Sequence, residues 1–157
     1  MKNDRFLIGI LIGIVLIIVA ALGAFFLRQN ANTYLPEDTP NGIVNNYILA
    51  LYDQDYEKAY SYLAEGELKP SFDTFRQAFV SGSLYLGNVS FKISETSESQ
   101  KQATVYLTYI YSASGPFNEP YRESQMATLV LENGIWKITN MPYPLWNWDW
   151  YQEVPQK

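Results

Sequence analysis

The stretch QMATLVLENGIWKITN, residues 125–140, carries the clearest turn signal in the chain. Asn133 and Gly134 stand between two apolar runs, and this dipeptide favours a two-residue β-hairpin turn because both positions need a positive φ. Counting outward from the turn pairs Leu131 with Trp136 on one face. The stretch therefore predicts two antiparallel strands that share a core face.

Two more strands are predicted before this hairpin. Residues 89–95 alternate apolar and polar side chains, as expected of a strand with one buried face. Residues 103–113 form a longer run, with Tyr109 and Tyr111 on one face and Tyr106 on the other. Its apolar and aromatic content predicts a central strand that is covered on both faces.

The front half of the chain has helical spacing instead. One helix is predicted from Pro40 with Thr39 as its N-cap, a second follows Asp55 and ends before Gly66, and a third spans residues 72–82. Helices followed by strands define an α+β domain. We therefore expect about three helices packed on a curved antiparallel sheet of about four strands, after an N-terminal transmembrane helix.

The transmembrane prediction comes from an uncharged apolar run over Phe6–Leu27. As a helix, this run is about 33 Å long, enough to cross a hydrocarbon core of about 30 Å. A cleavable signal peptide is the alternative, but its apolar core is usually only ~7 to 15 residues. Lys2 and Arg5 precede the run, which favours a cytoplasmic N-terminus and a domain outside the cell membrane. Gly9 and Gly13 form a GxxxG pair, so helix dimerisation is left open.

The predicted organisation has five parts. They are a cytoplasmic tail at 1–5, a single-pass signal-anchor at 6–27, a tether at 28–40, the α+β domain at 41–141 and a Trp-rich C-terminal extension at 142–157.

Composition excludes several classes of function. The chain has no Cys and no His, which removes thiol nucleophiles, disulfides, ordinary zinc sites and Ser-His-Asp triads. The net charge is -5 without a basic stripe, so no nucleic-acid partner is expected. Asp53, Asp55 and Glu57 have the spacing that begins a calcium loop, but Lys58 stands where that loop needs Gly. We expect no metal and no cofactor.

The order of elements resembles a known superfamily. Helices containing YILALYDQDYEKAYSYLA, residues 47–64, precede strands that close with LENGIWKI, residues 131–138. Over residues 40–140 this order resembles the nuclear-transport-factor-two-like superfamily of cystatin-like cones, in particular its small membrane-anchored or lipoprotein-borne bacterial members. The resemblance implies a sheet that curls around helices, with an open end that can hold a small molecule.

Some members of that superfamily are isomerases, dehydratases or cyclases that use an Asp or His inside the cone. The strand carboxylates of this chain, Glu95, Glu98, Glu119, Glu123 and Glu132, all fall at predicted strand ends or turns. Exposed carboxylates lack the environment that shifts a pKa toward the working pH. No catalytic residue is therefore assigned, and an enzyme is the less favoured alternative.

The most distinctive feature of the domain expected outside the membrane is PYPLWNWDWYQ, residues 142–152. In an extended strand Trp146, Trp148 and Trp150 would form one apolar row. The row could fold over the domain as a lid, bind an envelope protein or glycan, or rest in the lipid headgroup region. Tyr109 and Tyr111 could line a ligand pocket, although packing in the core is the plainer account.

The sequence thus predicts a membrane-anchored, extracytoplasmic, noncatalytic interaction or ligand-holding module of the cell envelope. The expected binding residues are Trp146, Trp148, Trp150, Tyr109 and Tyr111. The alternative is a small-molecule pocket protein or enzyme of the same cone fold.

Overall fold

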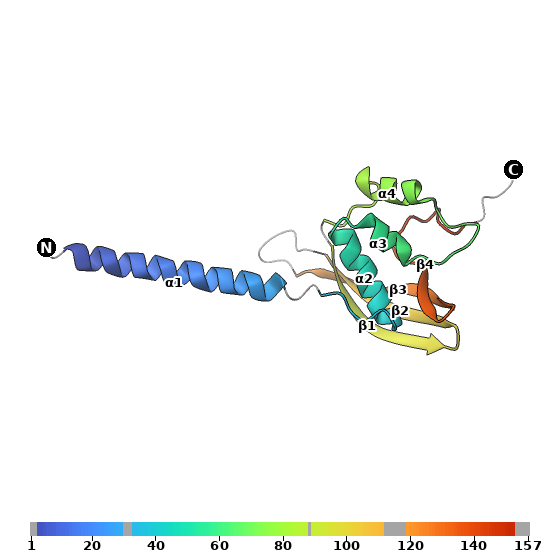
Figure 1. Cartoon of the computed structure of the whole chain (residues 1–157), viewed down its shortest axis with the longest axis horizontal. Helices are drawn as coiled ribbons and strands as arrows, with labels where there is room; N and C mark the ends of the chain where they lie inside the picture. The colour runs from blue at the N-terminus through green and yellow to red at the C-terminus, as the bar shows by residue number, and fades with distance from the viewer. Residues whose placement is uncertain (1–2, 30–32, 88, 112–118, 153–157) are drawn as a thin grey trace. The chain divides into compact units, whose positions relative to one another are not determined.

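The computed structural model describes residues 3–29, 33–87, 89–111 and 119–152 (Figure 1). The chain divides into two compact units, Met1–Thr33 and Tyr34–Lys157. The first unit contains helix α1, Asn3–Gln29. Within the described residues, no helix meets the length and apolarity needed to cross a membrane. The transmembrane prediction therefore rests on the sequence alone.

The second unit begins with three helices, each started by a side-chain cap. They are α2 (Pro40–Tyr52), α3 (Tyr56–Ser61) and α4 (Phe72–Val80). The Thr39 hydroxyl accepts a hydrogen bond from Gly42 N at 3.1 Å, and Asp55 accepts one from Lys58 N at 3.1 Å. Both predicted N-caps are thereby confirmed.

Helix α3 is shorter than its apolar spacing predicted. It ends at Ser61, and Leu63 then makes a parallel bridge to Ile138. Ile138 N donates to Tyr62 O, and Ala64 N donates to Ile138 O, both at 2.8 Å. Pairing with a distant strand satisfies these backbone groups, so it replaces the last turn that helical periodicity indicated.

The four strands form one antiparallel sheet in chain order. They are β1 (Val89–Ser99), β2 (Gln102–Tyr111), β3 (Tyr121–Glu132) and β4 (Ile135–Asn140). In the last hairpin Leu131 pairs with Trp136 as predicted. Asn133 and Gly134 have φ of 51° and 82°, which is the backbone that the Asn-Gly dipeptide favours. Register shifts interrupt the β1–β2 and β3–β4 pairings, and such irregularities bend a sheet.

Strand β1 is longer than the alternating apolar pattern at residues 89–95 predicted. Residues 96–99, which lie beyond the strand predicted at 89–95, pair with residues 102–105 of β2. A strand at a sheet edge can be polar on both faces because its neighbour satisfies the backbone hydrogen bonds. The pattern of side chains therefore underestimated the length of this strand.

The helices cover one face of the sheet, and the core lies between the two layers (Figure 1). Tyr47 of α2, Phe75 of α4 and Leu107 of β2 are fully buried there. Central placement of β2 is confirmed by its two strand neighbours. Its predicted cover on both faces is wrong, because Tyr106 on the opposite face is 40% exposed.

The segment before α2 is held to the helix by a buried amide. Asn46 is fully buried, its Oδ1 accepts from Leu35 N at 2.7 Å, and its Nδ2 donates to Leu35 O at 2.8 Å. Part of the predicted tether, residues 28–40, therefore contacts the domain.

Candidate functional site

The Trp-rich segment after β4 does not form a strand. Leu145 N donates to Pro142 O at 2.9 Å, and Trp150 N donates to Asn147 O at 3.1 Å, so two turns reverse the chain. A turn abolishes the two-residue alternation on which the predicted indole row depended. The expectation that all three indoles share one face is therefore wrong.

Two of the three indoles are buried in the core. Trp146 and Trp150 are 3% and 4% exposed, with their ring centroids 5.1 Å apart. Trp150 also lies 5.2 Å from the ring of Phe75 and 6.2 Å from that of Phe79 on α4. For these two residues, the lid hypothesis is confirmed.

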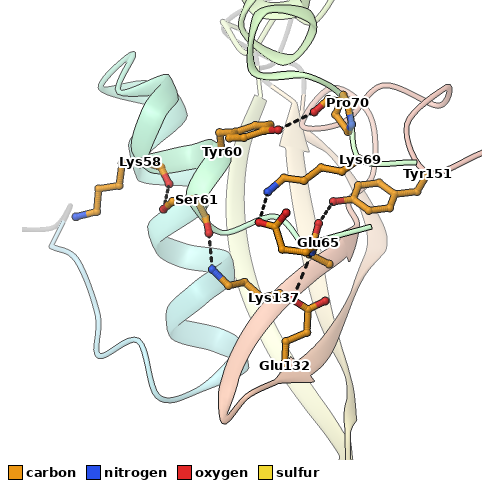
Figure 2. Close-up of polar contacts among 10 residues, drawn as sticks. Lys58, Tyr60, Ser61, Glu65, Lys69, Pro70, Glu132, Lys137 and Tyr151 are labelled. Atoms are coloured by element: carbon orange, nitrogen blue, oxygen red, sulfur yellow. Dashed lines mark hydrogen bonds and ion pairs between the residues drawn. The ribbon is translucent and has the colours of Figure 1, made fainter. Parts of the chain in front are cut away.

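Hydrogen bonds from tyrosines fix this lid to the rest of the domain. Tyr47 donates from inside the core to Leu145 O at 2.6 Å, and Tyr109 donates to Pro142 O at 3.2 Å. At the far end of the segment, the hydroxyl of Tyr151, which is labelled in Figure 2, donates to the carbonyl of Ala64. The segment is thus anchored along its length.

The loop that receives Tyr151 is itself braced by polar contacts (Figure 2). Lys69 forms an ion pair with Glu65 at 2.7 Å, and Glu65 N donates to Glu132 at 3.3 Å. Lys137 of β4 donates to Ser61 O at 2.5 Å. Glu65 thus joins the α3–α4 loop to the last hairpin, and Lys137 joins β4 to the end of α3.

Trp148 behaves differently from its two neighbours. Its indole is 81% exposed and lines a groove of about 530 Å³. Tyr143 and Met126, which are 68% and 53% exposed, line the same groove. The remaining lining residues are Gln125, Asn140, Met141, Pro142, Trp146 and Gln152. The described lining is therefore aromatic, thioether and carboxamide, without a charged side chain.

Two tyrosines expected at a ligand pocket have other roles. Tyr109 is fully buried with its ring 4.7 Å from Phe91, so it packs in the core and holds Pro142. Burial, and then the neighbouring Tyr111 and Glu123, raise the pKa of Tyr109 far above its ordinary value. Tyr111 is half-buried, with its ring 5.7 Å from that of Tyr121. Neither residue lines the described groove.

Glu123 corrects the prediction that every strand carboxylate lies at a strand end or turn. It lies within β3, opposite Tyr109, on the face that carries the core. Its carboxylate accepts hydrogen bonds from Gln125 Nε2 at 2.5 Å and the Tyr111 hydroxyl at 3.5 Å. The apolar pattern had placed the start of β3 too late, since the residues before Met126 are mostly polar.

Within the described residues, no group of three or more acidic side chains is placed to hold a metal ion. Asp55, the central residue of the calcium-like spacing, instead caps α3.

Comparisons with known proteins gave similarities of structure at low sequence identity. A SEC-C motif containing protein from Rhodopseudomonas palustris matches at TM-score 0.48 and 12% identity, over 68% of this chain and 79% of that one. A proposed calcium/calmodulin-dependent protein kinase type II association domain from Thiobacillus denitrificans matches at TM-score 0.47 and 10% identity, over 64% and 89%. A proposed NTF2-like transpeptidase from Campylobacter jejuni matches at TM-score 0.44 and 18% identity, over 64% and 96%. No family model and no curated protein matches the chain.

Proposed function

We propose that this protein is a noncatalytic binding module of the cell envelope, which holds a partner or ligand in the groove beside Trp148. One observation carries the proposal: an indole that is 81% exposed stands at the rim of an uncharged groove. Exposed Trp and Tyr side chains supply large contact area at interfaces and are enriched among residues that dominate binding energy. Trp146 and Trp150 support the groove from within the core.

We further propose that Phe6–Leu27 anchors the protein in the cell membrane, with the N-terminus in the cytoplasm and the domain outside. The uncharged run and the early Lys2 and Arg5 support this placement. Apolar side chains around the helix are exposed within the protein, among them Ile8, Leu11, Ile14, Leu16 and Ile17. Exposed apolar side chains in this run are what the proposed contact with lipid requires.

The absence of cysteine allows a direct test of the membrane topology. Single cysteines introduced as Ser83→Cys and Asn3→Cys are treated with a membrane-impermeant maleimide on intact cells. We expect labelling at position 83, labelling at position 3 only after lysis, and retention of the chain in carbonate-washed membranes. Labelling of position 3 in intact cells would contradict the orientation.

Photo-crosslinking tests the proposed binding site in the full chain. Benzoylphenylalanine replaces Trp148 in one variant and Tyr85, which is 65% exposed on another surface, in the control. We expect a discrete adduct at position 148 that disappears when Met126→Lys places a charge in the groove. Equal adducts at positions 148 and 85, or none at 148, would refute the binding site.

The second candidate is a small-molecule pocket enzyme of the nuclear-transport-factor-two-like cone, to which the order of elements is similar. The half-buried Glu123 on the core face favours it. However, the Glu123 carboxylate already accepts from Tyr111 and Gln125, and it is not among the residues that line the groove. We therefore rank the binding module first.

A further inference from the structure

Strand β3 is longer than the strand that pairs with its outer edge. It spans Tyr121–Glu132, whereas its pairing with β4 extends only from Glu132 back to Thr128. In the described part of the chain, no strand pairs with residues 121–127 on that side. A strand edge of this kind presents backbone donors and acceptors that another chain can use.

The register shows which residues face the open edge. In an antiparallel sheet the N–H and C=O groups of alternate residues point to opposite neighbours. Leu131 N donates to Lys101 O at 2.9 Å on the β2 side, and the β2–β3 register continues without a shift. The backbone N–H and C=O groups of the odd-numbered residues of β3 therefore point to β2. Those of Arg122, Ser124 and Met126 point to the open edge.

The groove beside Trp148 adjoins this edge. Its lining combines Gln125 and Met126 of β3 with Tyr143, Trp146 and Trp148 of the segment after β4. The lid cannot itself act as the missing strand, because its turns and the hydrogen bonds from Tyr47 and Tyr109 hold it in another conformation. One end of the open edge, at Gln125 and Met126, thus shares a groove with the exposed rings of Tyr143 and Trp148.

We propose that the occupant of the groove is an extended polypeptide segment of a partner protein, which adds to β3 as a strand. Its backbone pairs with Arg122, Ser124 and Met126, and alternate side chains contact Trp148 and Tyr143. The inference rests on the proposed function, since it names the partner class of the same groove. The uncharged lining selects apolar or neutral side chains at the inward positions.

A polypeptide fits this site better than a glycan or a second copy. Backbone groups on alternate residues recur about every 6.6 to 6.8 Å along a strand, which is the repeat of another extended chain. A second copy would bring its whole sheet behind its own β3, which needs more room than a single extended segment beside the exposed Tyr143 and Trp148. A single segment needs only the groove.

Proline substitution at the edge provides a matched pair of variants. Ser124 is exposed, and Ser124→Pro removes its N–H from the open edge while the pairing with β2 does not use that group. Ser124→Ala keeps the N–H and is the control. Random heptapeptides displayed on phage are selected on the full chain in a sugar-free detergent, and their affinities for the three proteins are measured. We expect Ser124→Pro to weaken binding at least about tenfold and Ser124→Ala to change it less than about threefold.

N-methylation of a selected peptide tests the strand geometry without changing the protein. Methyl groups on residues of one parity should weaken binding at least about tenfold, whereas those on the other parity should have little effect, because only alternate N–H groups face β3. Equal effects of both parities, or no peptide that distinguishes Ser124→Pro from Ser124→Ala, would overturn the inference.

The two proposals fail in different ways. If chitotetraose, and no peptide, protects Trp148 from quenching by acrylamide, the groove is a binding site but its occupant is a glycan. Concentration-dependent dimers lost in Ser124→Pro would instead identify a second copy as the occupant. A failure of crosslinking at position 148 would remove the proposed function itself.

Discussion

Tyr47 links helix α2 to the C-terminal lid from inside the core. Its hydroxyl donates to Leu145 O at 2.6 Å, and both residues are fully buried. Tyr47→Phe would leave that carbonyl without its donor, which costs about 1 to 2 kcal/mol. We expect this loss in urea unfolding, together with greater acrylamide quenching of the lid tryptophans. Tyr52→Phe, which removes an exposed hydroxyl bonded to Val89 O, is the control and should cost less.

Trp150 offers a second residue-scale prediction. Its Nε1 is buried and has no hydrogen-bond partner among the described residues. Trp150→Phe removes an unsatisfied donor and keeps a ring against Phe75, so we expect a cost below about 1.5 kcal/mol. Trp150→Ala should cost about 3 to 5 kcal/mol because it leaves a cavity. Similar costs for the two substitutions would show that the indole nitrogen is satisfied in solution.

At the scale of elements, the β3–β4 hairpin depends on its turn. Gly134 has φ of 82°, and a Cβ added there would meet no atom within 4 Å. Gly134→Ala therefore tests backbone conformation alone, and we expect a cost of about 1 kcal/mol in thermal or urea unfolding. Asn133→Gly keeps a residue that tolerates a positive φ and should change stability by less than half as much. If Gly134→Ala left the free energy of unfolding unchanged, the turn would have relaxed to another type.

The whole domain should lose stability in alkali. Burial is the main cause that raises the pKa of Tyr47 and Tyr109 well above the ordinary tyrosine value of 10.0. Above pH 10 the unfolded chain ionises these hydroxyls while the folded chain keeps them protonated. The folded state then holds more protons than the unfolded state, so the free energy of unfolding falls as pH rises.

Urea unfolding between pH 7 and 12 tests this dependence. We expect the tyrosine contribution to be constant below about pH 9, and each buried tyrosine to add a slope of up to ~1.4 kcal/mol per pH unit above pH 10. Tyr109→Phe should flatten the slope, whereas Tyr121→Phe, at a position 65% exposed, is the control. An unchanged slope in Tyr109→Phe would exclude this tyrosine as a source.

Local signals predicted much of this molecule correctly. The N-caps Thr39 and Asp55 and the Asn133–Gly134 turn depend on neighbouring backbone, so their residue types determine them directly. The candidate site was only partly predictable. The indole spacing drew attention to the segment that contains the candidate residue Trp148, but nothing local distinguished Trp148 from Trp146.

By itself, the sequence determined the α+β class, the order of helices before strands and the register of the last hairpin, because periodicity and turn chemistry act over a few residues. Only the tertiary structure decided that helix α3 ends at Ser61 and that Glu123 lies on the core face of β3. It also decided that, of the three C-terminal tryptophans, Trp148 is the exposed one. Those outcomes depend on contacts between segments far apart in the chain, such as Tyr47 with Leu145 and Leu63 with Ile138. The open edge of β3 belongs with them, since it exists only because β4 ends before its neighbour does.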